Sequence, residues 1–147
     1  AQAAYRAVSL WIKEEGTMAW LDGQLRPGDR FLDVGANVGI YTLAAAHRVG
    51  PQGRVYAVEP NKPNAVALMQ NVAANGFQDR IDILAIPLTD AREIAAFNYT
   101  SLKASDSGSQ FGSTVRDGQG QSFVPVARVL PLSMITMRVQ SCSTSSM

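Results

Sequence analysis

Residues 30–40 read Arg30-Phe31-Leu32-Asp33-Val34-Gly35-Ala36-Asn37-Val38-Gly39-Ile40. The run from Phe31 to Val34 is short and apolar, as in a strand buried on both faces, and an apolar-periodic helix through Leu43 follows Gly39. Gly35 and Gly39 let the backbone turn sharply and approach a ligand closely, and the first free amides of the helix offer donors to a carboxylate or phosphate. The stretch therefore predicts a nucleotide-type binding corner.

The glycine spacing restricts the ligand. A dinucleotide fingerprint counted from Gly35 needs glycine at position 37 and glycine or alanine at position 40, where this chain has Asn37 and Ile40. Residues 54–58 read as a second strand, and Glu59 follows it about 20 residues past the turn, where a ribose-binding acid is expected. One carboxylate can accept hydrogen bonds from two vicinal hydroxyls. The spacing therefore argues against a dehydrogenase-like NAD-binding module, but a ligand that contains a nucleoside stays consistent with the sequence.

Composition places the chain among ordinary globular proteins. It has 147 residues, 46% of them hydrophobic and 17% charged, with a net charge of +1. Lysine and arginine form no basic run, which argues against a nucleic-acid partner. Cys142 is the single cysteine, so no internal disulfide framework exists, and no apolar run approaches the length of a membrane span. We therefore expect one modest domain with no membrane partner, in the cytoplasm.

The pattern of apolar residues predicts alternating helices and strands. Residues 1–25 read as one or two helices broken near Gly16, with Trp11 and Trp20 packed against a sheet. The helix after the glycine turn should end near Val49, before Gly50-Pro51. A further helix should begin at residues 60–63 and end at Asn75-Gly76, and its predicted buried residues are Val66, Met69, Val72 and Ala73.

The third strand is predicted at residues 81–88, and two more at residues 93–99 and 123–129. The polar residues between them, 100–122, favour a mobile surface loop over a substrate lid. Two βα units followed by a strand predict an α/β fold, a Rossmann-like, doubly wound, mostly parallel sheet with right-handed crossovers.

Three sequence blocks together resemble the FkbM-type family of S-adenosylmethionine-dependent methyltransferases. They are Asp33-Val34-Gly35-Ala36-Asn37-Val38-Gly39, Gly53-Arg54-Val55-Tyr56-Ala57-Val58-Glu59-Pro60-Asn61 and Asn71-Val72-Ala73-Ala74-Asn75-Gly76. The resemblance covers roughly residues 25–129. It implies S-adenosylmethionine as the cofactor and methyl transfer to a hydroxyl oxygen of a sugar or natural product, so that the partner is a small-molecule or glycan acceptor.

The resemblance also implies roles for individual residues. Four residues of the turn would surround the methionine moiety (Gly35, Ala36, Asn37 and Gly39), and Asp33 would either stabilise the turn or reach the ammonium group. Glu59 would hold the ribose hydroxyls, and Asn61 would cap the next helix or contact the nucleoside, capping being preferred. Ala85 and Ile86 would flank adenine.

No catalytic base is assigned from the sequence, and no metal site is expected. The carboxylates of Asp82, Asp90 and Glu93 are chemically able to act as a general base, but lone carboxylates are more commonly solvated. His47, the single histidine, lies far along its helix from the turn and is expected to be solvated or packed.

The end of the chain departs from the family pattern. Relatives continue with a strand of the type Lys-Ile-Asp-x-Glu-Gly, whereas residues 131–147 have neither helix nor strand periodicity. We therefore divide the chain into an N-terminal helical segment at 1–25, the cofactor-binding domain at 26–130, truncated, and an atypical tail at 131–147. A truncated or frame-shifted chain should expose the apolar edge of the first strand, be poorly soluble or oligomeric, and lack activity. A non-catalytic nucleotide-binding remnant stays open as an alternative.

Overall fold

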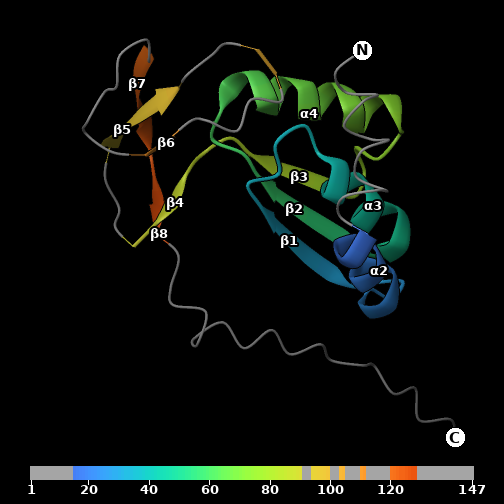
Figure 1. The fold of residues 1–147 in the computed structure, drawn as a ribbon. Helices are drawn as coiled ribbons and strands as arrows, with labels where there is room; N and C mark the ends of the chain where they lie inside the picture. Colours follow the sequence, from blue (N-terminus) through green and yellow to red (C-terminus); the bar gives the residue numbers. More distant parts are fainter. Residues whose placement is uncertain (1–14, 91–93, 100–102, 105–109, 112–119, 129–147) are drawn as a thin grey trace, which may run out of the picture.

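The structure, a computed structural model, describes residues 15–90, 94–99, 103–104, 110–111 and 120–128 (Figure 1). Its helices are α2 (Glu15–Gln24), α3 (Ile40–Val49) and α4 (Lys62–Ala74). Its strands are β1 (Arg30–Val34), β2 (Arg54–Val58), β3 (Ile81–Leu84), β4 (Leu88–Thr89), β5 (Ile94–Tyr99), β6 (Gln110–Phe111), β7 (Gly120–Pro125) and β8 (Ala127–Arg128). The predictions for Trp11, Glu93 and residues 131–147 lie outside the described residues.

A parallel sheet of strand order β1-β2-β3 carries the βα units, as the sequence predicts. The connections β1-α3-β2 and β2-α4-β3 both move to the next strand in the same direction across the sheet. Two right-handed crossovers in the same direction place their helices on the same face of a sheet. Side chains of α2, α3 and α4 accordingly share one core with the inward residues of β2 and β3. The mixed α/β fold is confirmed. The second helical layer of a doubly wound sheet is not among the described residues.

The core lies between this sheet and the three helices. Val55 and Ala57 lie on the same face of β2 and are fully buried. They belong to one core with buried residues of the helices, Leu21, Ala45, Ala46, Val49 and Leu68. Val34 is 62% exposed, so a first strand buried on both faces is wrong at this residue. The reason is that β1 is the edge of the described sheet and that strand side chains alternate, which turns Val34 away from the helices.

The helix ends follow the signals in the sequence. Helix α3 ends at Val49, and Gly50 follows with φ of 67°, a conformation that glycine adopts without steric cost. Asn61 is the N-cap of α4, and its side chain accepts a hydrogen bond from the Asn64 N–H at 3.4 Å. Pro63 lies in the first turn. The predicted ends of α3 and α4 and the capping role of Asn61 are confirmed.

The predicted inner face of α4 is right at Val72 and wrong at Val66, Met69 and Ala73, all three of which are exposed. Ala65, Leu68 and Val72 are buried, whereas Val66 is 52% and Met69 49% exposed. Both sets have helical spacing, and the buried set is the one that meets the glycine turn and the sheet. Trp20 is also 54% exposed rather than packed against the sheet, because Leu21 takes the inward position on α2.

The region after β3 differs from the prediction in two ways. The third strand ends at Leu84 instead of residue 88, and β4 pairs in parallel with β8. Parts of the polar stretch, Gln110–Phe111 and Gly120–Ser122, are strand residues paired antiparallel with β5, so they are not loop. Phe97, Val124 and Val126 form a small core there. Among the described residues, no helix is long and apolar enough to cross a bilayer.

Candidate active site: the cofactor corner

The glycine turn after β1 is held by the end of β2. The backbone amides of Gly35 and Ala36 both donate to the Val58 carbonyl, at 2.9 and 3.0 Å. Gly35, Asn37 and Gly39 have φ of 81°, 52° and 93°. Asparagine tolerates this left-handed region better than most residues do, because its short side chain bonds locally. Here Asn37 Oδ1 accepts the Val38 N–H at 2.8 Å.

The two glycines of the turn meet different surroundings. A Cβ atom on Gly35 would have no atom of the described residues within 4 Å, and Gly35 itself is exposed, so this side of the turn is accessible. A Cβ atom on Gly39 would lie 2.2 Å from Leu68 Cδ1. Gly35 therefore leaves room for a ligand, whereas Gly39 allows α4 to pack against the turn.

Glu59 joins the two loops that follow β1 and β2. Its Oε2 accepts the Asn37 N–H at 2.7 Å, and its Oε1 accepts the Asn61 N–H at 2.8 Å. Glu59 is only 5% exposed. Burial raises the pKa of its carboxyl group, the hydrogen bonds from Asn61, Asn37 and Asn64 oppose this rise, and the nearby charge of Asp33 adds to it.

Asp33 stabilises the turn from the strand side. The Thr42 hydroxyl on α3 donates to Asp33 Oδ2 at 2.5 Å. Burial raises the pKa of the Asp33 carboxyl group, and hydrogen bonds from Thr42 oppose the rise. This hydrogen bond joins β1 to α3, as a turn-stabilising Asp33 would, and a contact of Asp33 with the ammonium group stays a prediction.

The predicted site residues gather at the carboxyl ends of the strands. Asp33, Gly35, Ala36, Asn37 and Gly39 follow β1, and Glu59 and Asn61 follow β2. Ala85 and Ile86 come directly after β3, and the Glu59 N–H donates to the carbonyl of Leu84, the last residue of β3, at 3.0 Å. Ligands of open α/β sheets bind at this edge.

The amides of the turn itself are not free donors, whereas the donor role expected for the first amides of the following helix stays a prediction. The amides of residues 35–39 all have partners within the protein: Val58 O for two of them, Glu59 Oε2, Asn37 Oδ1 and Ala36 O. Buried amides are normally satisfied in this way. Outside this network, the exposed side of Gly35 and the remaining lone-pair site of Glu59 are left for a ligand.

Helix α4 supplies contacts that the sequence did not reveal. Asn71 Nδ2 donates to the Val38 carbonyl at 2.8 Å, and Leu68 occupies the space left by Gly39. Asn71 begins a family-like block in the sequence, but nothing in the sequence pairs it with Val38, which lies 33 residues earlier.

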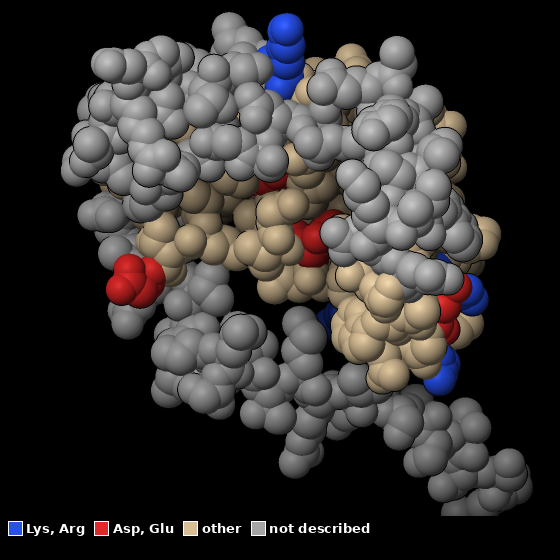
Figure 2. Space-filling model, viewed as in Figure 1, with Lys and Arg blue, Asp and Glu red and all other residues tan. Residues whose placement is uncertain are grey.

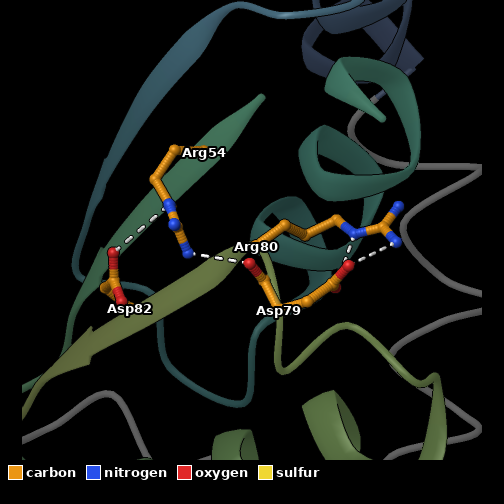
Figure 3. A network of polar contacts seen from close by, with 4 residues as sticks. All are labelled: Arg54, Asp79, Arg80 and Asp82. Atoms are coloured by element: carbon orange, nitrogen blue, oxygen red, sulfur yellow. Dashed lines mark hydrogen bonds and ion pairs between the residues drawn. The ribbon is translucent and has the colours of Figure 1, made fainter. Parts of the chain in front are cut away.

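Asp82, one of the candidate bases from the sequence, does not lie in this corner. Figure 3 shows Asp82 beside Arg54, with Arg54 also reaching Asp79, at the amino ends of β2 and β3. Arg54 Nε is 3.8 Å from Asp82 Oδ2, and Arg54 Nη1 donates to the Asp79 carbonyl at 2.8 Å. Asp82 is therefore at the wrong edge of the sheet for a base. Asp90 and His47 are exposed, as expected for solvated groups.

Charge is unevenly spread over the face shown in Figure 2. Acidic side chains lie near its middle among uncharged residues and also at its left and right margins, and Lys and Arg side chains lie mainly at its top and right. In the part of the chain that the structure describes, no group of three or more His, Cys, Asp or Glu side chains could hold a metal ion.

Comparison with known proteins identifies the family. The methyltransferase FkbM domain matches residues 33–133, more than half of the chain, so the chain belongs to the FkbM methyltransferase domain family. Membership in this family implies S-adenosylmethionine as the cofactor.

Three curated proteins share parts of the sequence. The 31-O-demethyl-FK506 methyltransferase FkbM of Streptomyces tacrolimicus is 40% identical over 63 residues, which are 43% of this chain and 24% of that protein. The AMB antimetabolite synthetase AmbE of Pseudomonas aeruginosa is 37% identical over 79 residues, 53% of this chain and 4% of that protein. A tRNA1(Val) (adenine(37)-N6)-methyltransferase of Shewanella amazonensis is 33% identical over 87 residues, 59% of this chain and 35% of that protein. The chain therefore spans about a third or less of these relatives.

Two solved structures are similar to this chain. A SAM-dependent O-methyltransferase from Thermotoga maritima has a TM-score of 0.43 and 28% identity, covering 48% of this chain and 26% of that one. A SAM-dependent methyltransferase from Aquifex aeolicus has a TM-score of 0.43 and 26% identity, covering 53% of this chain and 43% of that one.

The residues of the corner fit S-adenosylmethionine. Gly35 is exposed, and the Glu59 carboxylate carries about four lone-pair sites, of which the N–H groups of Asn37 and Asn61 and the Asn64 side chain use three. Vicinal hydroxyls of a ribose need acceptors of this kind.

Proposed function

We propose that this chain binds S-adenosylmethionine at the carboxyl ends of β1 and β2 and serves O-methyl transfer to a hydroxyl group of a small-molecule or glycan acceptor. The single observation that carries the proposal is the position of Glu59. Its buried carboxylate lies between the glycine turn and the N-cap of α4, and about one of its lone-pair sites is left for a ligand.

The cofactor supplies a methyl group on a sulfonium, and the protein positions it. In this proposal Glu59 accepts hydrogen bonds from the ribose hydroxyls, and the turn at Gly35, Ala36 and Asn37 surrounds the methionine moiety. Asp33 keeps the turn attached to α3 through Thr42. Ala85 and Ile86, beyond β3, contact adenine. Since methyl transfer is an in-line displacement, alignment of donor and acceptor is the main task of these residues.

Two observations support a hydroxyl acceptor: the name of one relative and the distribution of basic side chains on the surface. The Streptomyces protein is named for transfer to an oxygen of FK506. The Shewanella protein is named for transfer to a tRNA adenine, but nucleic-acid binding needs a basic surface. On the face in Figure 2, basic side chains of the described residues form no continuous patch. We therefore favour a hydroxyl acceptor and propose the cytoplasm as the compartment.

Calorimetric titration of the chain with S-adenosylhomocysteine and with NAD tests the binding proposal. S-adenosylhomocysteine should bind and NAD should not. Glu59→Ala should weaken binding by roughly tenfold or more, because hydrogen bonds to a charged group are lost. Asp82→Asn is the control, since it removes a carboxylate at the opposite edge of the sheet. Binding of NAD alone, or unchanged affinity in Glu59→Ala, would contradict the proposal.

The acceptor is tested separately with labelled S-adenosylmethionine. Hydroxyl-bearing sugars and macrolides form one panel, and tRNA forms the other. Label should enter the hydroxyl panel when the chain is supplied within its whole protein. Exclusive labelling of tRNA would contradict the acceptor class and leave cofactor binding intact.

A further inference from the structure

The carbonyl group of Val38 needs a partner that α3 does not provide. Val38 is 4% exposed and precedes Gly39, the N-cap of α3. The Leu43 N–H donates to the Gly39 carbonyl at 2.9 Å, so hydrogen bonding along α3 starts one residue after Val38. A buried carbonyl without a partner costs free energy. The turn therefore depends on a donor from elsewhere.

That donor is the side chain of Asn71, in the C-terminal half of α4. Asn71 Nδ2 donates to Val38 O at 2.8 Å. Leu68, three residues earlier on the same helix, packs where Gly39 has no Cβ. Residues three apart lie on one helix face, so α4 meets two consecutive residues of the turn with one face.

Two contacts from different parts of the chain thus hold the same short segment. Glu59 accepts the N–H of Asn37 at 2.7 Å, and Asn71 donates to the carbonyl of Val38. Between them the chain has a non-glycine residue at positive φ, Asn37 at 52°. Such a conformation persists where surrounding contacts fix it.

We propose that Asn71 is a positioning residue, whose amide fixes residues 37–39 in the conformation that receives the cofactor. The consequence for the cofactor rests on the proposed function. The effect on the turn does not, since it is a property of the protein alone. Asn71 acts through the Val38 carbonyl and need not touch the ligand.

Hydrogen exchange of the unliganded chain tests the effect on the turn. Asn71→Leu keeps the volume and removes the donor, and the amides of Asn37 and Gly39 should exchange roughly tenfold faster or more. The amide of Val55, bonded to the Arg80 carbonyl at 2.8 Å, is the reference for global opening and should be unchanged. Asn71→Gln keeps a donor and should restore part of the protection. Equal exchange at Asn37 and Gly39 in parent and Asn71→Leu would overturn the proposal.

Asn75→Ala is the matched control. Asn75 Nδ2 donates to the Asn71 carbonyl at 2.8 Å, so this variant also loses a side-chain hydrogen bond from α4, but at an exposed site away from the turn. Exchange at Asn37 should stay at the parental rate. If Asn75→Ala and Asn71→Leu accelerate it equally, α4 acts only through its general stability and the proposal is wrong.

Titration with S-adenosylhomocysteine then measures the consequence for the cofactor. Asn71→Leu should bind roughly tenfold more weakly than the parent, and Asn75→Ala should bind equally well. If the parent itself fails to bind, the proposed function fails, and the exchange experiment still decides the role of Asn71. If the parent and Asn71→Leu bind equally, the positioning role is overturned and the proposed function stands.

Discussion

Glu59 and Asn37, 22 residues apart in the sequence, are joined by a 2.7 Å hydrogen bond from the Asn37 N–H to the Glu59 carboxylate. The other oxygen of Glu59 accepts the Asn61 N–H at the start of α4. Glu59 therefore fixes the loops after β1 and β2 relative to each other. An acid predicted only as a ribose ligand also stabilises the site in the absence of ligand.

The pH dependence of stability should carry the sign of buried acids. Burial raises the pKa values of Asp33 and Glu59, so between the ordinary carboxyl range and the raised values the folded chain binds more protons than the unfolded chain. Their contribution to stability is present at low pH and is lost as pH rises through the raised pKa values. Urea unfolding of the parent and of Glu59→Gln across this window measures it. The variant should show a less negative slope against pH, and identical slopes would contradict the assignment to Glu59.

The two glycines of the turn should respond differently to alanine. Gly35→Ala introduces backbone strain of about 1–2 kcal/mol without a steric clash. Gly39→Ala has similar strain and also overlaps Leu68, which adds about 1–3 kcal/mol. Urea denaturation should therefore rank Gly39→Ala as the less stable variant.

A double-mutant cycle isolates the overlap at Gly39. Leu68→Ala alone should cost about 2–5 kcal/mol through the cavity it leaves. Combined with Gly39→Ala it should cost less than the sum of the two single changes, because the clash is relieved. Additive costs would show that Leu68 does not restrict this position.

Asn61→Ala separates capping from ligand contact. The substitution removes the side chain that caps α4 and should cost about 0.5–2 kcal/mol of stability. The Asn61 N–H that Glu59 accepts belongs to the backbone and is retained. Affinity for S-adenosylhomocysteine should hence stay near the parental value. A tenfold or greater loss of affinity would instead place the Asn61 side chain against the nucleoside.

Asp82→Asn tests whether the amino edge of the sheet has any part in catalysis. Asp82 pairs at 3.8 Å with Arg54 in the exposed network of Figure 3. Solvent-exposed ion pairs contribute little, so stability should change by less than about 1 kcal/mol. Methyl transfer by the whole protein should be unchanged. A large loss of turnover in this variant would reverse the placement of the site.

The sequence predicts best what local signals determine. Gly50 ends α3, and Asn61 with Pro63 begins α4, because these residues have conformations and hydrogen bonds that few others supply. Val72 was predicted correctly as buried in α4, but Ala65 and Leu68 were missed because Val66 and Met69 are apolar residues at equally helical spacing. Which residues of α4 face the core depends on a tertiary contact, the packing of Leu68 against Gly39.

Contacts between distant segments could not be predicted. The bonds of Glu59 to Asn37 and of Asn71 to Val38 exist because β1 and β2 pair in parallel and α4 returns over the turn. The ligand-binding roles of the site residues stay predictions, as do the boundaries at residues 25 and 130. The expected truncation or frame shift, and the lack of activity drawn from it, also stay predictions, because residues 131–147 lie outside the described part of the chain.

The central claim is that S-adenosylmethionine binds where the carboxyl ends of β1 and β2 meet. Titrating S-adenosylhomocysteine into the isotope-labelled chain, with amide chemical shifts as the readout, tests it most directly. The amides of Gly35, Asn37 and Asn61 should shift strongly with a common dissociation constant, and those of Arg54 and Asp82 at the opposite edge should not move. Shifts concentrated at Arg54 and Asp82, or no shift at Asn37 at saturation, would contradict the claim.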